Sequence, residues 1–263
     1  MKAIIPSSGN GTRMRPLTHL SPKEMMEINN KPLIYHAVVE CVKSKINEII
    51  IVIKKDKLSI KEYFEEIKNS NEAHPDFLFN KILNNEVEIS FVIQEEANGS
   101  GGAILAAKEI IKDEDFVVIF PDVYVQEESP NILDMIELSE KYNSYIIMVD
   151  LINKNEIDRY GVTINTDKSS NHYFIEEIIE KPSFMPDSEV FHGIIGRYVL
   201  KNEFISVLEQ LDKNMKNEID LTQGLITLEK KIAKVVKGKH FECGSINSYK
   251  ESLRIMDKKR SLK

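Results

Sequence analysis

Apolar residues in the first half of the chain form short runs that alternate with helical patterns. Continuous aliphatic or β-branched runs predict strands at residues 3–6, 49–53, 89–93, 116–120 and 145–149. Between them, apolar residues spaced three and four apart predict amphipathic helices, which start at residue 32 or span residues 57–67, 103–111 and 132–142. Strands separated by such helices form βαβ units, so the pattern predicts a mainly parallel sheet covered by helices.

The pattern is less regular after about residue 150. It predicts further strands at residues 162–164, 173–179 and 191–200, and further helices at residues 203–211, 221–230 and 246–257. Residues 69–85 are polar and irregular, and they resemble an insertion more than a domain boundary. We find neither an internal repeat nor a low-complexity linker, so we expect residues 1–263 to form a single domain.

Composition and charge exclude several classes of protein. The 263 residues include 35 basic and 42 acidic side chains, and the net charge of −7 argues against an indiscriminate nucleic-acid binder. No apolar run approaches the roughly 18 residues of a membrane span, and the N-terminal run ends at Pro6, unlike a secretory signal. Cys41 and Cys243 cannot make a disulfide framework or a four-cysteine zinc site. We therefore expect a cytoplasmic protein with a solvated tail at residues 258–263.

The strongest chemical signal lies directly after the first strand, where residues 7–16 read Ser-Ser-Gly-Asn-Gly-Thr-Arg-Met-Arg-Pro. Gly9 and Gly11 allow a sharp turn that presents bare N–H groups to phosphate oxygens, and Arg13 adds a fixed positive charge. Met14 occupies the place of the third glycine in a dinucleotide fingerprint, and no Gly-Lys-Ser/Thr follows as in a P-loop. By itself, the loop is equally compatible with an ordinary turn from strand to helix.

Linked motifs give this loop a family context. Gly-x-Gly-Thr-Arg-x-x-Pro-x-Thr at residues 9–18 is followed by Pro-Lys-Glu-Met at residues 22–25 and Lys-Pro-Leu-Ile at residues 31–34. Together they resemble the signature of the sugar-nucleotidyltransferases, and the Pro-Lys-Glu-Met form resembles the bacterial UTP–glucose-1-phosphate uridylyltransferases in particular. Further similar stretches lie at residues 94–103, 121–123, 160–162, 180–182, 196–200, 217–222 and 243–244.

The resemblance implies an α/β fold, a Rossmann-like mixed, mainly parallel sheet flanked by helices. Its nucleotide-binding half would span about residues 1–125 and its sugar-binding half about residues 126–263. It also implies an enzyme that transfers the uridylyl group of UTP to glucose 1-phosphate and releases pyrophosphate. Since the attacking sugar phosphate is already an anion, such catalysis needs positioning and charge neutralisation rather than a general base.

The resemblance also assigns roles to individual residues. Gln94 can donate to and accept from the imide edge of uracil, but thymine has the same edge, so Gln94 does not choose between UTP and dTTP. The positions expected to act in catalysis are Arg13, Lys23, Asp122 and Lys181. Those expected to bind the nucleotide are Ser8, Gly9, Gly11, Thr12, Gln94 and Gly99, and those expected to bind the sugar are Gly161, Glu180 and Lys181.

Asp122 is the expected ligand of a Mg²⁺ cofactor, because it follows a strand at the carboxyl edge of the predicted sheet. Glu242 stands where the family usually has aspartate, and either a metal role or an exposed strand position fits it. Gln223 and Asn10 also depart from the family pattern, which leaves the sugar open. The alternatives are a nucleotidyltransferase for dTTP or another sugar 1-phosphate, and a catalytically silent nucleotide-sugar-binding protein. We expect small-molecule substrates, neither nucleic acid nor membrane as a partner, and leave a homo-oligomer open.

Overall fold

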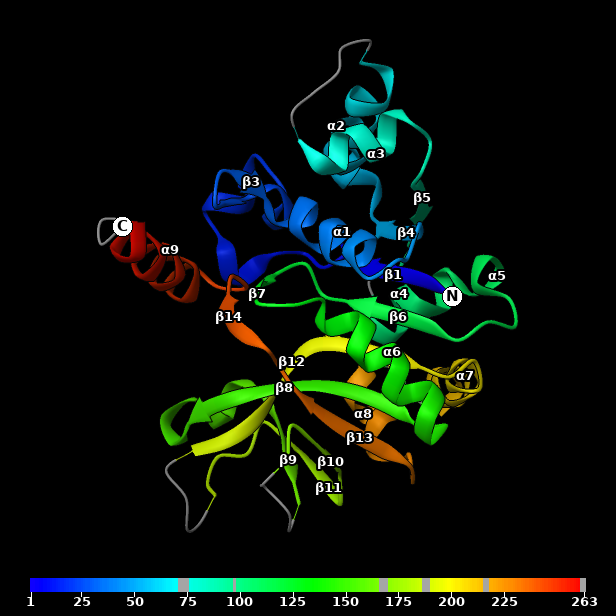
Figure 1. Ribbon diagram of the computed structural model, residues 1–263, viewed down its shortest axis with the longest axis vertical. Helices are drawn as coiled ribbons and strands as arrows, with labels where there is room; N and C mark the ends of the chain where they lie inside the picture. The colour runs from blue at the N-terminus through cyan, green and yellow to red at the C-terminus, as the bar shows by residue number, and fades with distance from the viewer. Residues whose placement is uncertain (71–75, 97, 166–169, 186–189, 215–217, 261–263) are drawn as a thin grey trace.

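A mixed sheet organises the protein (Figure 1). The computed structural model describes residues 1–70, 76–96, 98–165, 170–185, 190–214 and 218–260. Within these ranges the sheet has ten strands, eight of which follow the order β10-β13-β8-β12-β6-β1-β4-β5. The other two, β9 and β11, form a branch that is attached to β12. Helices cover the sheet, so the predicted α/β fold class is confirmed.

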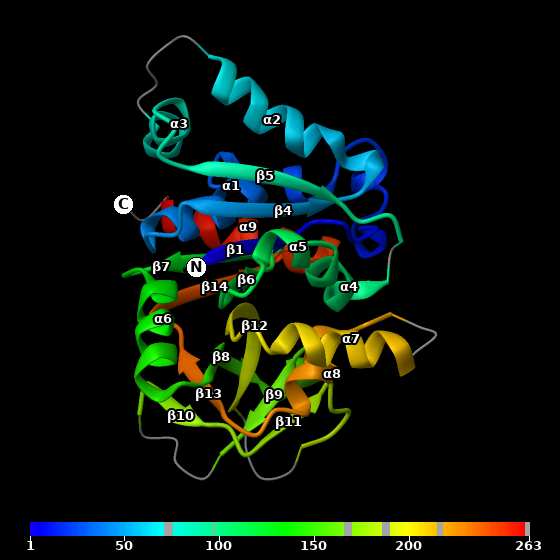
Figure 2. The ribbon, with the colours of Figure 1, turned by 90° about the vertical axis from the view of Figure 1, so that its right-hand side faces the viewer.

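The strands from the first half of the chain pair in parallel. Figure 2 shows three of them, β5, β4 and β1, one below the other. Every residue of β1 is buried, as are the five residues that follow Glu48 in β4, which explains their continuous apolar runs. The bounds of these strands are β1 Lys2–Pro6, β4 Glu48–Ile53, β5 Glu88–Ile93 and β6 Phe116–Ile119.

Helices pack on both faces of the sheet, as Figure 2 shows for α6 on one side and α4 and α7 on the other. The first apolar core includes residues of α1 Leu33–Lys43, α2 Leu58–Asn69, α3 Phe77–Leu83 and α6 Asn131–Tyr142. The second includes residues of α4 Gly99–Ala106, α5 Lys108–Ile111, α7 Phe204–Asn214 and α8 Leu221–Ile226.

The strands from the second half of the chain mix both directions. Strand β12 (Val190–Leu200) runs antiparallel to both β6 and β8 (Tyr145–Asn153), and so joins the two halves of the sheet. Beyond β8, the strand β13 is parallel and β10 antiparallel to its neighbour. The bounds of the remaining strands of the sheet are β9 Gly161–Ile164, β10 His172–Phe174, β11 Glu177–Glu180 and β13 Lys231–Val235.

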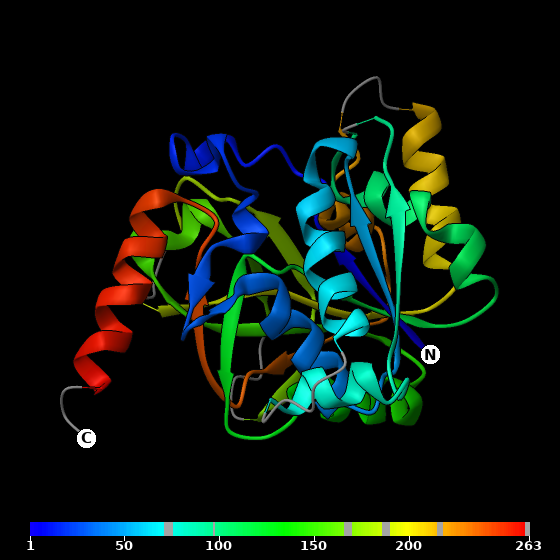
Figure 3. The same cartoon turned by 90° about the horizontal axis from the view of Figure 1, so that it is seen from above.

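A two-stranded ribbon lies beside the sheet. It pairs β7 (Val123–Glu127) with β14 (Gly238–Glu242), and α9 (Ile246–Arg260) packs against β14. Figure 3 shows α9 at one side of the molecule, far from the N-terminus. The shorter ribbon of β2 (Glu27–Ile28) and β3 (Lys31–Pro32) precedes α1.

Four predictions from the sequence are wrong in detail. The single strand expected at residues 173–179 is two strands, because the chain leaves β13 after Phe174 and joins β9 at Glu177. The helix expected at residues 221–230 ends at Ile226, and β13 follows it. The irregular stretch 69–85 contains α3, and α9 continues into the expected tail. Residues 261–263 of that tail lie outside the described residues. Among those that are described, no helix is long and apolar enough to cross a membrane.

Asp76 fixes the start of α3. Its Oδ1 accepts hydrogen bonds from the Leu78 and Phe79 amides, at 3.0 and 3.3 Å, and from the Tyr35 hydroxyl at 2.7 Å. Its Oδ2 lies 2.6 Å from Lys31 Nζ. Burial would raise the pKa of Asp76, but these hydrogen bonds and Lys31 outweigh it and lower the pKa below its usual value.

We expect Asp76→Ala to lower the free energy of unfolding at pH 7 by about 1–2 kcal/mol, because it removes a helix cap and an ion pair. Asp76→Asn, which keeps a capping oxygen, should lose less. Because the folded pKa lies below the unfolded one, the contribution of Asp76 is complete above the unfolded pKa and disappears as pH falls through the folded one. Urea unfolding of the three proteins at pH 7 and at acidic pH measures this; equal stability of wild type and Asp76→Ala at pH 7 would contradict it.

Candidate active site

The glycine-rich loop leaves the carboxyl end of β1 at the edge of the sheet. Gly11 has a φ of +62°, a left-handed conformation that favours glycine, and its carbonyl accepts a 2.9 Å hydrogen bond from Thr18 Oγ1. Gly9 is exposed, and a Cβ atom built on it would meet nothing within 4 Å. Thr12 and Arg13 are exposed in the short 3₁₀ turn that follows, while Met14 is buried. The loop is thus anchored at Gly11 by Thr18, and the space around Gly9 is open.

Lys23 and Asp122 form an ion pair at the carboxyl ends of the parallel strands. Lys23 Nζ lies 2.6 Å from Asp122 Oδ2, and each side chain is only 15% exposed. Burial disfavours both charges, but the pair outweighs it: the pKa of Lys23 is raised, and that of Asp122 is lowered, with help from the charge of Arg13. The structure therefore brings together three of the four residues that the sequence assigned to catalysis.

Glu24, the residue after Lys23, forms a second ion pair in the interior. Glu24 is fully buried, and both its oxygens accept from Lys57 Nζ, at 2.9 and 2.8 Å. Lys57 also donates to the Ser7 carbonyl at 2.7 Å. In a 3₁₀ turn, neighbouring side chains point in different directions, so Lys23 meets Asp122 while Glu24 is tied to the β4–α2 connection and to the glycine-rich loop. The Pro-Lys-Glu-Met motif thus fixes two separate contacts.

A second carboxylate lies beside Asp122. The β7–β14 ribbon places Glu242 opposite Val123, and the next amide, of Cys243, donates to the Asp122 carbonyl at 2.8 Å. Burial raises the pKa of Glu242, and the nearby charge of Asp122 raises it further. Gly244 keeps the space in front of Asp122 open, since a Cβ atom there would lie 3.1 Å from Asp122 Oδ2 and 3.4 Å from Arg13 Nη2.

Two adjacent carboxylates fit Mg²⁺, which commonly binds one or two carboxylates together with phosphate oxygens of the substrate. Because the charge of Asp122 raises the pKa of Glu242, a positive charge beside the two carboxylates would stabilise the ionised form of Glu242. The described residues contain no group of three or more His, Cys, Asp or Glu side chains that could hold a metal ion. Asp122 and Glu242 would therefore need further oxygen ligands, such as those of a phosphate.

Gln94 is buried at the end of β5 and held on both sides. Its Oε1 accepts a hydrogen bond from Ser8 Oγ, and its Nε2 donates to Asn98 Oδ1 at 2.6 Å. A Cβ atom built on Gly102 would lie 1.7 Å from Asn98 Oδ1, so the side chain of Asn98 occupies this place because residue 102 is glycine. Neither Asn98 nor Gly102 is among the site residues predicted from the sequence, although both lie in the motif at residues 94–103.

Gly99 brings the chain close to a neighbouring segment. It has a φ of +89°, and a Cβ atom on it would lie 2.6 Å from the Ile219 carbonyl. The amide of Ile219 donates to the Asn98 carbonyl at 2.7 Å, and the Gly101 amide donates to the Ile219 carbonyl at 2.8 Å. Residues 97 and 217, which belong to the two motifs that meet here, lie outside the described residues.

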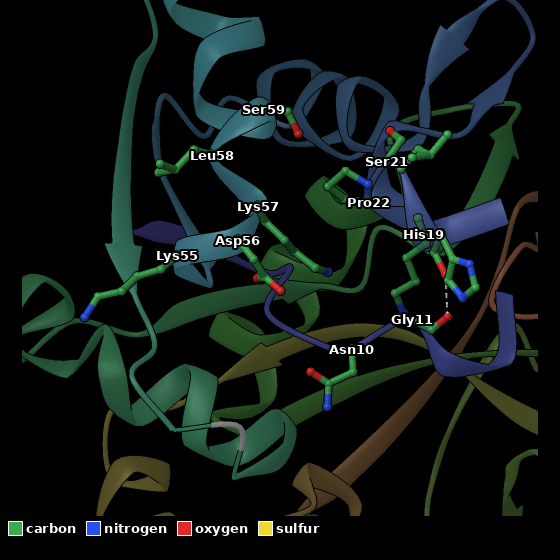
Figure 4. Close-up of a pocket in the computed structure, with 13 residues that line it drawn as sticks. Asn10, Gly11, His19, Ser21, Pro22, Lys55, Asp56, Lys57, Leu58 and Ser59 are labelled. Carbon is green, nitrogen blue, oxygen red and sulfur yellow. Dashed lines mark hydrogen bonds between the residues drawn. The ribbon is translucent and has the colours of Figure 1, made fainter. Parts of the chain in front are cut away.

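Two cavities open on either side of the glycine-rich loop. One of about 170 Å³ is lined by Ser8, Gln94 and Gly99, among others, and also by Lys23. The other, of about 400 Å³, lies between the segment at residues 18–23 and the β4–α2 connection at residues 55–59 (Figure 4). Asn10 and Lys23 line both cavities, so the loop and the central lysine separate two adjoining spaces.

The residues predicted to bind a sugar meet through the pairing of β9 with β11. Glu180 lies opposite Gly161, and a Cβ atom on Gly161 would be 2.9 Å from Glu180 Oε2. Glu180 Oε1 accepts from Lys181 Nζ at 2.6 Å, whereas Glu180 Oε2 is buried and has no hydrogen-bond partner in the described part of the chain. A buried acceptor without a partner is costly, so this oxygen is suited to a ligand hydroxyl.

Tyr160 connects this end of the site with the carboxylates. Its carbonyl accepts a 3.0 Å hydrogen bond from the Lys181 amide. Burial raises the pKa of its phenol, and the nearby charge of Glu242 contributes to the shift. The predicted sugar and metal residues therefore border a common region. His192 is outside this chemistry, because it stacks on Tyr173 and hydrogen-bonds its hydroxyl at 2.7 Å.

Comparison with known proteins agrees with this geometry. The model of a family described as nucleotidyl transferase matches residues 2–258. The chain belongs to the nucleotidyl transferase family. The resemblance seen in the sequence motifs is thereby confirmed at the level of the family.

Members of the nucleotidyl transferase family with named activities are similar over almost their whole length. A UTP–glucose-1-phosphate uridylyltransferase of Pseudomonas aeruginosa is 32% identical, over 95% of this chain and 94% of its own. One of Bacillus subtilis (strain 168) is 34% identical, over 92% and 86%. A solved UDP-glucose pyrophosphorylase complexed with UDP-glucose has 31% identity and a TM-score of 0.83, with 98% of each chain covered.

We expect Gly102→Ala to raise the KM for the nucleotide about 3- to 10-fold and to leave kcat nearly unchanged. The added methyl group must displace the Asn98 side chain, and Gln94 then loses a hydrogen bond of about 0.5–1.5 kcal/mol. The fold should persist, because alanine favours a helix. Asn98→Ala is the matched variant and should give the same KM. Steady-state kinetics decide this, and a wild-type KM in both variants would show that the contact does not hold Gln94.

Proposed function

We propose that this chain transfers the uridylyl group of UTP to glucose 1-phosphate and so forms UDP-glucose and pyrophosphate. The observation that carries the proposal is a cavity that Gln94 and Lys23 both line, because an amide suited to a base and a cation suited to a phosphate then border the same space. The named activity of the relatives supports it, as do similar solved structures that are bound to UTP or complexed with UDP-glucose.

Gln94 is suited to uracil because of the hydrogen bonds that it already makes. The Ser8 hydroxyl donates to one lone pair of the Gln94 side-chain oxygen, and Asn98 accepts one of the two amide hydrogens of Gln94. One lone pair of the Gln94 oxygen remains, and the second N–H group makes only a long hydrogen bond, 3.5 Å, to the Gly99 carbonyl, which a base can replace. The imide edge of uracil offers a carbonyl and an N–H group to match this donor and this acceptor. Gly99, which lies in the same cavity, lets a base approach the backbone.

The phosphates belong at the Lys23–Asp122 pair. We assign Asp122 and Glu242 as the residues that hold Mg²⁺, which when bound offsets phosphate charge and aligns the reacting groups. Lys23, kept protonated by Asp122, supplies a fixed positive charge to the phosphate that is attacked. Arg13 is exposed beside Gly244 and can bind the oxygens of the leaving pyrophosphate bidentately. Gly9, Gly11 and Thr12 contribute backbone N–H groups to the same phosphates.

The sugar phosphate belongs at the β9–β11 pair. Glu180 Oε2 is buried without a partner in the described chain and can accept from a sugar hydroxyl, and Gly161 leaves room beside it. Lys181 is 53% exposed and can exchange its contact with Glu180 for the sugar phosphate. We assign the half of the chain up to about residue 125 to the nucleotide and the rest to the sugar. Cytoplasmic location and homo-oligomer formation stay predictions.

The proposal is tested by a panel of UTP, dTTP, CTP and GTP, each with glucose 1-phosphate and with other sugar 1-phosphates. Release of pyrophosphate is measured. We expect UTP with glucose 1-phosphate to have the highest kcat/KM. A preference for dTTP or for another sugar 1-phosphate would support the reaction type but contradict the assigned substrate. If the folded protein releases no pyrophosphate from any pair, it is a catalytically silent nucleotide-sugar-binding protein instead.

We expect Asp122→Asn to lose at least about 100-fold in kcat at ordinary Mg²⁺, because the change keeps the shape but removes a negative charge from the cation site. Activity should recover in part as Mg²⁺ or Mn²⁺ is raised, since mass action compensates for weaker binding. Metal titrations of both proteins, with melting curves as the control for folding, measure this. An unchanged metal midpoint in a folded variant would remove Asp122 from the metal site and leave Glu242 as the candidate.

A further inference from the structure

Arg197 is fully buried, with 0% of its side chain exposed, and uses every N–H group that it has. Nε and Nη2 donate to the two oxygens of Glu40, at 3.0 and 2.6 Å. The remaining donors go to backbone carbonyls: Nη1 to Phe120 at 3.0 Å and to Ile195 at 3.4 Å, and Nη2 to Val123 at 2.6 Å. Five donors in a fixed plane are a property of arginine alone among side chains.

The carbonyls of Phe120 and Val123 flank Pro121 and Asp122. One guanidinium thus holds the backbone on both sides of the carboxylate assigned to the metal, yet it does not touch that carboxylate. Arg197 comes from β12 in the second half of the chain, and Glu40 comes from α1 in the first. The three segments that meet here are separated by 74 to 157 positions in the sequence.

The backbone of β12 is distorted where Arg197 enters the interior. The pairing of β12 with β8 shifts register between Ile194 and Tyr198. Gly196 within this shift has a φ of +72°, and its carbonyl accepts a 2.9 Å hydrogen bond from the Phe120 amide. A bulge of this kind redirects a side chain at the expense of regular strand pairing. Here it accompanies the entry of a charged side chain into the core, next to the turn that carries Asp122.

Uncharged side chains could fill a purely structural role at this position equally well. Replacing a buried ion pair by apolar side chains of similar volume is often neutral or stabilising. The pair is therefore weak as a source of stability, but the guanidinium gives the carbonyls of Phe120 and Val123 a defined position. Precision of this kind matters most for a group that has to hold a cation and a phosphate in line.

We propose that Arg197, oriented by Glu40, is a positioning residue for Asp122. It fixes the Pro121–Asp122 turn so that the carboxylate stays beside Lys23 and Glu242. It also links the position of this turn to strand β12, which carries Arg197. This inference rests on the proposed function, because the chemical role of Asp122 is part of that function.

The test compares the double variant Glu40→Leu/Arg197→Met with wild type. The double variant removes both charges at once, so neither is left buried without its partner. Lys201→Met is the matched control, because Lys201 pairs with Asp115 at 3.0 Å at the other end of the same β6–β12 strand pair. Arg197→Lys is a second variant, which keeps the charge but has three donors in place of five.

Four quantities are measured: the melting temperature, kcat and KM with UTP and glucose 1-phosphate, and the binding of Mn²⁺ in the presence of UTP alone. Free Mn²⁺ is followed by electron paramagnetic resonance, which requires no turnover. We expect the double variant and Arg197→Lys to lose about 10- to 100-fold in kcat and in Mn²⁺ affinity, with the KM for UTP within about twofold. Lys201→Met should lower only the melting temperature.

Wild-type kcat and Mn²⁺ affinity in the folded double variant would overturn the proposal and leave the pair a structural one. If the double variant does not fold, wild-type values in Arg197→Lys would overturn it equally. Failure of the proposed function looks different, because wild-type protein itself would then release no pyrophosphate from UTP. The Mn²⁺ measurement would still show whether Arg197 controls the site of Asp122.

Discussion

Charges at this site are buried, and a buried charge is stable only with a partner. The structure meets this constraint with three ion pairs: Lys23 with Asp122, Lys57 with Glu24, and Arg197 with Glu40. Their members lie 99, 33 and 157 positions apart in the sequence. Each pair therefore connects distant segments, and together the pairs hold this part of the sheet in place.

The pairs differ in how much a ligand can change them. Lys57 and Glu24 are enclosed and tied to the Ser7 carbonyl, so they belong to the scaffold. Lys23 and Asp122 keep 15% of their side chains exposed, and Lys23 also lines both cavities beside the glycine-rich loop. In the proposed reaction, a phosphate would attract the lysine and a cation would attract the aspartate, so the two ligands together would replace an interaction that neither could replace alone.

The sequence predicts the first half of the fold better than the second for a physical reason. Strands β1 and β4 are buried on both faces and therefore show continuous apolar runs. In the second half, β13 reads Lys-Ile-Ala-Lys-Val, and its spacing of charges resembles an exposed helix. The structure buries both lysines: Lys231 Nζ donates to the Leu228 carbonyl at 2.5 Å, and Lys234 Nζ to that of Val235 at 2.9 Å. Such contacts have no local signature in the sequence.

The same difference applies to the site. Motifs locate Lys23, Gln94 and Asp122, because short segments with fixed spacing can be recognised locally, and the structure brings Lys23 and Asp122 into contact. What orients these side chains comes from elsewhere in the chain. Asn98 can reach Gln94 because residue 102 is glycine, and nothing in the sequence links those two facts. Motifs thus identify the groups that we assign to the substrate, whereas the residues that give them precise positions become visible only when distant segments are packed together.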